Sequence, residues 1–323
     1  EIQIDGSYTL ADIRLLPIDT LPPIDVALGY LVSGHDRVVG VLDRASITAP
    51  DGSVVDISGS RYILADTRPA IEYSTLDLVI DGPANGVLSI LALEPFHVLD
   101  NTDFGADVVR GRLALEGTVT FPTKGLTASI DNTTMALSGT ITDLRSDVLI
   151  KDRLLRADTA EITVSEHAVE VSGLARVGLA EVSGSWRQPL RNADRLRPSI
   201  TGTTEISARA MDEWGIGLPE GMLSGSGRGS FALAMPKTGP MRLSLSSDLG
   251  GVGLSVPGTG WSKPAAATGE LAIEASLGET ARIDSLRLTA RGLSAEGQVT
   301  TTAAGGLGTA TFPHGISYYQ PNV

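Results

Sequence analysis

Hydrophobic and polar positions alternate one by one along much of the chain, and the longest such run extends from Leu223 to Met235. Every odd position in this run is Leu, Gly, Phe or Met, and every even position is Ser, Arg or Ala. A period of two places successive side chains on opposite faces of a strand. The run therefore predicts one strand, about 43 Å long at about 3.3 Å per residue, with a single apolar face.

A shorter form of this pattern, apolar-x-apolar-x-Gly-x, recurs along the chain. Its copies begin at Val55, Leu113, Met135, Val169, Ala180 and Leu293. Turn-forming sequences such as Asp51-Gly52, Asp81-Gly82-Pro83 and Lys124-Gly125 separate the alternating runs, as they do in antiparallel hairpins. The whole pattern predicts a meander of about fifteen strands, three of them between Leu126 and Ile150.

Only two segments have helical character. Asn85 to Leu99 carries apolar residues at helical spacing before Pro95, which predicts a short amphipathic helix that ends near Glu94. Ala208 to Gly215 predicts one or two further helical turns. We expect both helices to cover an end of the sheet, and the alternative is that they dock a partner.

No secure linker divides the chain, and the polar segment Arg187 to Pro198 is the best candidate boundary. We expect the N-terminal part of the sheet over residues 1–190, including the helix near 85–94. The C-terminal part of the same sheet is expected over 191–308, followed by an irregular tail over 309–323. The first residues, Glu1 to Ile4, already belong to a strand-like pattern, so we expect the chain to be a piece of a longer protein.

Composition indicates how such a sheet is covered. Of the 323 residues, 42% are hydrophobic but only 4% are aromatic. Aromatic side chains normally supply much of a thick globular core, so a mainly aliphatic cover favours a long sheet or groove. The predicted fold class is mainly β: an elongated, curled antiparallel β-sheet, groove-like or β-taco-like, with one or two short helices.

Several function classes have no support in the sequence. A net charge of −13 without a basic cluster argues against nucleic-acid binding. Cysteine is absent, and the four histidines lack metal-binding spacing. Gly225 to Gly229 has the letters of a nucleophile elbow but continues as strand. We therefore expect no catalytic residue, no metal ligand and no cofactor, and the chain is not predicted to be an enzyme.

The most specific segment extends from Gly250 to Ile273. It joins a strand, a turn of the form P-x-x-x-W-x-K-P that contains Trp261 and Lys263, and a second strand. Leu288 to Gly297 then matches the pattern L-x-A-x-G-L-x-A-x-G. Over about residues 25–308 the chain resembles the AsmA-like superfamily, and within it the large YhdP-like envelope proteins with a DUF3971-type region.

This resemblance implies a sheet that holds or conducts phospholipid along an apolar β-groove between the inner and outer membranes. It implies phospholipid acyl chains as partners and a periplasmic location in a Gram-negative bacterium. It also implies attachment to the inner membrane through an anchor outside this chain.

Two strands supply the candidates for the groove lining. These are Leu113, Leu115, Val119, Phe121, Leu223, Phe231, Leu233 and Met235. Ordinary sheet core produces the same periodicity, so both interpretations stay open. Trp261 and Lys263 are candidates either for a groove rim that meets a phosphate headgroup or for a turn anchor, in which the ring covers the sheet edge and Lys263 is solvated.

Two functions of different classes therefore compete. One is lipid holding or conduction. The other is a non-catalytic structural or outer-membrane-protein assembly module of the AsmA type, in which sheet edges template other β-proteins and the apolar face is packed core. A polysaccharide-processing enzyme is the third alternative. The first two differ in whether the apolar face is open or covered.

Overall fold

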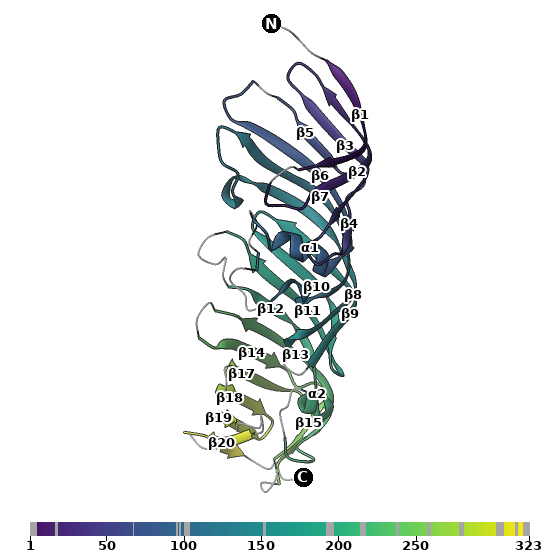
Figure 1. Ribbon diagram of the computed structural model, residues 1–323. Helices are drawn as coiled ribbons and strands as arrows, with labels where there is room; N and C mark the ends of the chain where they lie inside the picture. The colour runs from purple at the N-terminus through teal and green to yellow at the C-terminus, as the bar shows by residue number, and fades with distance from the viewer. Residues whose placement is uncertain are drawn as a thin grey trace. The chain divides into compact units, whose positions relative to one another are not determined.

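The computed structural model describes residues 5–16, 19–66, 68–94, 96, 98–99, 104–150, 153–191, 197–213, 218–236, 239–256, 260–277, 281–301, 307–313 and 316–318. These residues are mainly β, with strands β1 to β21 paired as antiparallel neighbours and two short α-helices (Figure 1). The predicted class, an antiparallel sheet of many strands with one or two helices, is confirmed. The chain divides into two compact units, Glu1–Gly173 with Pro189–Arg195 and Leu174–Gln188 with Leu196–Val323.

The first unit is a meander. Its strands are β1 (Gly6–Leu15), β2 (Ile24–Ser33), β3 (Val38–Thr48), β4 (Val54–Asp56), β5 (Arg61–Leu64), β6 (Glu72–Pro83), β7 (Arg110–Lys124), β8 (Thr134–Ile150), β9 (Arg153–Ser165) and β10 (Ala168–Val177), which begins in this unit. β3 pairs with β2 on one side and with both β4 and β5 on the other. β4 and β5 pair in turn with β6, and β6 to β9 follow in chain order.

Bulges keep the apolar side chains of these long strands on one face. In β8, Asp143 has a φ of 51°, and Asp12 in β1 has the same value. A bulge inserts one extra residue, so the parity of the inward positions changes beyond it. Leu137 and Ile141 are buried before Asp143, and Leu144 is buried after it. β8 is therefore one strand of 17 residues, not the separate short strands that the alternation predicted.

The first helix is α1 (Ala84–Leu91), and it packs against β4, β6 and β7. Val87 and Gly86 are buried in this contact. At Gly86 an added Cβ would lie 2.0 Å from the Ser53 hydroxyl oxygen, so a larger residue would require the Ser53 side chain to move. The helix ends earlier than predicted because Leu93 N–H bonds to the Ile90 carbonyl, three residues back, which tightens the last turn. Two 3₁₀ turns, Ala106–Val108 and Ile130–Asn132, precede β7 and β8.

The second unit is also antiparallel. Its elements are β11 (Ala180–Pro189), β12 (Ser199–Ser207), α2 (Ala208–Glu213), β13 (Leu223–Ala234), β14 (Met241–Ser247), β15 (Val252–Ser255), β16 (Ser262–Lys263), β17 (Gly269–Leu277), β18 (Ala281–Ala290), β19 (Leu293–Thr301), β20 (Leu307–Thr311) and β21 (Ile316–Tyr318). β13 pairs with β12 along one side, and on the other side it pairs first with β15 and then with β14. β14, β17, β18 and β19 complete the sheet in that order.

Three expectations about these elements need correction. The tail is not irregular throughout, since β20 and β21 both pair with β19. Asp81-Gly82-Pro83 does not form a hairpin turn, because all three residues belong to β6, which leads directly into α1. The described residues contain twenty-one strands where about fifteen were expected. The end of the second predicted helix, residues 214–215, lies outside the described residues.

Candidate functional site

The predicted lining residues of the first unit share one side of β7. Leu113 is 6% exposed, whereas Leu115, Val119 and Phe121 are partly exposed. Ala114, Glu116 and Thr118, on the other side of the strand, are exposed. The alternation in the sequence therefore separates one aliphatic side of β7 from one hydrated side.

Neighbouring strands extend this aliphatic side, because residues directly opposite each other in a sheet project from the same face. Val119 lies between Leu76 and Met135, and Leu115 lies opposite Ile80. We call the resulting surface face A; its members are Leu76, Leu78, Ile80, Leu113, Leu115, Val119, Phe121, Met135, Leu137, Ile141, Ile162 and Val164. Only Leu113, Leu137 and Ile141 of this set are buried. The others remain partly open to solvent.

Two glycines leave depressions in face A. At Gly139, which is opposite Leu115, an added Cβ would lie 1.9 Å from the Ala114 carbonyl oxygen. At Gly117, where φ is 148°, it would lie 2.1 Å from the Ala136 carbonyl oxygen. No side chain can stand at either position without moving the neighbouring strand. Face A is therefore lowest where these two glycines lie.

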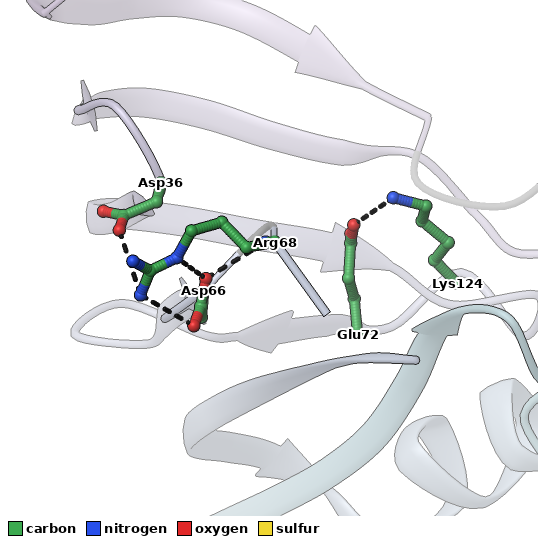
Figure 2. A network of polar contacts seen from close by, with 5 residues as sticks. All are labelled: Asp36, Asp66, Arg68, Glu72 and Lys124. Carbon is green, nitrogen blue, oxygen red and sulfur yellow. Dashed lines mark hydrogen bonds and ion pairs between the residues drawn. The ribbon is translucent and has the colours of Figure 1, made fainter. Parts of the chain in front are cut away.

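One end of face A is polar, and we call the group Tyr62, Glu72, Ser74, Thr123 and Lys124 the polar end. Glu72 and Ser74 lie on the inward side of β6, with 8% and 0% exposure. The Ser74 hydroxyl lies 2.7 Å from the Tyr62 hydroxyl and 3.2 Å from the Thr123 hydroxyl. Lys124 donates a hydrogen bond to the Glu72 carboxylate (Figure 2). Sequence reasoning missed this group, although Glu72 and Ser74 have the parity of Leu76 and so break the apolar pattern visibly.

A second ion cluster belongs to the loop that precedes β6, and Figure 2 shows it with the Glu72–Lys124 pair. Arg68 donates from Nε to Asp66 at 2.7 Å and lies 3.3 Å from Asp36 through Nη2. The hydrogen bond from Arg68 holds the pKa of the Asp66 carboxyl below its usual value. The Arg68 side chain is 69% exposed, and those of Asp36 and Asp66 are 33% and 39% exposed, so their pairing at the surface contributes little to stability.

The second unit has its own aliphatic surface, which we call face B. Leu233 lies between Ile200 and Leu243, and Phe231 lies opposite Leu245. Face B comprises Trp186, Ile200, Phe231, Leu233, Leu243, Leu245, Ile273 and Leu286. All eight side chains are partly exposed. Met235, a predicted lining residue, follows β13 and donates its N–H to the Pro198 carbonyl.

Leu223, the remaining predicted lining residue, belongs to a covered region instead of face B. It pairs with Leu254 and packs against a core of Ile206, Leu249 and Val252, which are 3%, 1% and 0% exposed. We call β15, β16 and the turn Asp248–Gly251 the end cover. At Gly227 an added Cβ would lie 2.4 Å from the Gly250 carbonyl oxygen. The glycines of β13 therefore leave room for the backbone of the turn Asp248–Gly251.

Lys263 belongs to the end cover, and Trp261 directly precedes β16. Trp261 is 3% exposed and donates from Nε1 to the Arg291 carbonyl at 3.1 Å. Lys263 is 4% exposed, and its ammonium donates to the carbonyls of Leu249 at 2.8 Å, Val252 at 2.6 Å and Pro264 at 3.3 Å. The expectation of a solvated Lys263 is wrong, and a rim position facing a headgroup is not available to it.

The environment of Lys263 opposes its charge. Burial lowers the pKa of the Lys263 ammonium below its ordinary value of 10.5, and the Asp248 carboxylate raises it in part. The carbonyl oxygens supply the negative ends of dipoles in place of water. Lys263 therefore connects β16 to the turn Asp248–Gly251 and to Val252 through buried hydrogen bonds.

Two further features are absent from the described residues. No three His, Asp or Glu side chains among them come together in a metal-binding arrangement; His97 and His314 lie outside the described part of the chain. None of the described helices has the length and hydrophobicity needed to cross a bilayer. Comparison with protein-family models, with curated proteins and with solved structures found no match for the chain.

Proposed function

We propose that the chain holds or conducts phospholipid, with acyl chains lying on faces A and B, as a segment of a bacterial envelope protein. The observation that supports this proposal best is the exposure of face A. Its aliphatic side chains lie in cross-strand rows over neighbouring strands, yet Leu115, Val119 and Phe121 are only partly buried. A packed sheet core would bury such residues more completely. Partly open, contiguous apolar surface marks a place where another apolar molecule binds.

The dimensions of face A suit an acyl chain. From Leu113 to Phe121 the strand advances eight residues, or about 26 Å at about 3.3 Å per residue. One leaflet of a bilayer is about 15 Å deep in its hydrocarbon part, so the strand is long enough for a single acyl chain. Each buried methylene contributes roughly 0.8 kcal/mol, and no directional polar contact is needed along the chain.

The cellular setting of the proposal comes from the sequence alone. The Trp261–Lys263 turn and the Leu288–Gly297 strand motif resemble the AsmA-like superfamily. On that resemblance we place the chain in the periplasm, as part of a protein anchored in the inner membrane, where it would carry phospholipid toward the outer membrane.

Photocrosslinking tests this proposal directly. We expect a photoreactive amino acid at Leu115, Phe231 or Leu233 to form phospholipid adducts that mass spectrometry detects. The same amino acid at Glu116 or Ser230, on the hydrated faces of the same strands, is the matched control and is expected to form none. Crosslinks from the inward positions only to other parts of the chain would reject lipid binding and support the structural or assembly function.

A further inference from the structure

The polar end of face A contains a charge that sheet packing does not require. The Glu72 side chain is 10% exposed, and its partner Lys124 is 60% exposed. Removing a carboxylate from water costs several kcal/mol, and apolar residues of the same size often stabilise a protein as well or better. The adjacent inward positions of β6, from Leu76 onward, are in fact aliphatic. The Glu72–Lys124 pair therefore calls for a role other than packing.

Both groups have unused hydrogen-bonding capacity. An ammonium has three donors, and a carboxylate can accept about four hydrogen bonds. The Lys124 side chain is mostly in solvent, so it can turn its ammonium toward a ligand. Glu72, in contrast, is mostly buried beside a group of bonded hydroxyls. The Thr123 hydroxyl of β7 donates to the Glu72 main-chain carbonyl, and the Ser74 hydroxyl of β6 bonds to those of Tyr62 in β5 and Thr123.

We infer that the polar end binds the headgroup of a zwitterionic phospholipid of the ethanolamine type, with its acyl chains on face A. The Lys124 ammonium binds the phosphate, and the ammonium of the headgroup takes the place of Lys124 at the Glu72 carboxylate. This inference rests on the proposed function, because it names the lipid class that face A would hold.

The charges at the polar end favour this class over two others. An anionic headgroup such as glycerol would meet Lys124 but would also place its phosphate next to the Glu72 carboxylate with no cation to offset it. A choline headgroup has no N–H, so it cannot donate a hydrogen bond to the Glu72 carboxylate. An ethanolamine headgroup supplies one negative and one positive group and forms charge-assisted hydrogen bonds with both side chains.

A competition experiment tests this inference. The purified chain is incubated with vesicles of equimolar phosphatidylethanolamine, phosphatidylcholine and phosphatidylglycerol, re-isolated, and its bound lipid is quantified by mass spectrometry. We expect about tenfold enrichment of phosphatidylethanolamine, as one charge-assisted hydrogen bond can provide. Glu72→Gln is expected to bring the ethanolamine-to-choline ratio close to one, while Lys124→Gln lowers the binding of all three lipids.

The control variant is Arg112→Gln. Arg112 pairs with Asp81 at 2.6 Å across the same two strands but on their hydrated face, so its loss is expected to leave the lipid ratio unchanged. Binding without headgroup preference, or preference for phosphatidylglycerol, would overturn the inference and leave the proposed function standing. Absence of any bound lipid in the wild type would overturn both. The wild-type ratio and the exposed Lys124 variant decide the matter even where Glu72→Gln fails to fold.

Discussion

Lys263 places a full charge in an interior made of backbone carbonyls. Three carbonyl oxygens within 3.3 Å replace the water that the ammonium loses. Hydrogen bonds to a charged group contribute more than neutral ones, and a buried group that loses its partner costs the full desolvation penalty. The stability of the end cover therefore depends strongly on the Lys263 side chain.

Replacing Lys263 with Met is expected to destabilise the protein by about 2–4 kcal/mol, because the carbonyls of Leu249 and Val252 lose their donor in a buried site. Urea denaturation measures this change. Arg287→Met is the control, since Arg287 pairs with Glu296 at the surface and its side chain is 58% exposed; its effect is expected to stay within about 0.5 kcal/mol. Equal effects of the two substitutions would contradict the role assigned to Lys263.

The sequence reveals the polar end of face A better than it reveals the burial of Lys263. Glu72 and Ser74 occupy apolar-parity positions of β6, so a polar interruption of the face was readable from the alternation. Lys263 was misjudged as solvated because its partners are main-chain carbonyls, which carry no residue-specific signal. Burial of a lysine against backbone depends on the path of a distant turn, here Asp248–Gly251, and the local pattern contains no information about that path.

At the scale of the strands, strict alternation predicts the position of a strand well, but interruptions of the alternation do not always mark the end of a strand. The run from Leu223 became β13 with an end at Ala234, one residue before the predicted end. For β8 the alternation predicts breaks after Leu137 and after Leu144, but the pairing with β9 continues through both positions, from Ala136 to Ser146. The local pattern carries no information about this pairing. β20 and β21 are short and lack a sustained alternation, so their pairing with β19 depends on tertiary structure.

The turn before β4 holds the start of α1 through one carboxylate. Asp51 accepts hydrogen bonds from the Ser53 hydroxyl at 2.7 Å, the Ser53 N–H at 3.0 Å and the Asn85 amide at 2.6 Å. The bonds from Ser53 are the main reason that the pKa of the Asp51 carboxyl lies below its usual 3.8. Since the charged form is favoured in the folded state, Asp51 stabilises the fold above pH 3.8.

Asp51→Ala is expected to lower the free energy of unfolding by about 1 kcal/mol at pH 7, because these hydrogen bonds are exposed to solvent. Below pH 3.8 the unfolded state binds more protons at this site than the folded state, so the contribution of Asp51 disappears as the pH falls through the lowered pKa. Chemical denaturation of the wild type and the variant between pH 7 and pH 2.5 measures the shrinking difference. A difference that stays constant with pH, as expected for a change in local packing alone, would contradict this account. Asp158→Ala, at an exposed position of β9, is the matched control.

At the scale of the whole molecule, substitutions at neighbouring residues can distinguish groove lining from sheet core. Leu115→Asp places a carboxylate at a partly exposed site and is expected to cost about 1–2 kcal/mol while it abolishes lipid binding to face A. Leu113→Asp, two residues away and 6% exposed, is expected to cost roughly 3–5 kcal/mol. Phe231→Asp removes binding to face B alone, so lipid mass spectrometry of the Leu115 and Phe231 variants, single and combined, separates the two faces. Unfolding by both Leu115→Asp and Phe231→Asp would show that the faces are core.

The meander has a consequence for how each unit can change in length. From β6 to β9, consecutive strands pair with one another in chain order. The stability of such an array is close to a sum over nearest neighbours, as in repeat proteins. A hairpin inserted between two strands would therefore lengthen the aliphatic track without disturbing the pairs on either side. Evolution could adjust the reach of such a protein one hairpin at a time.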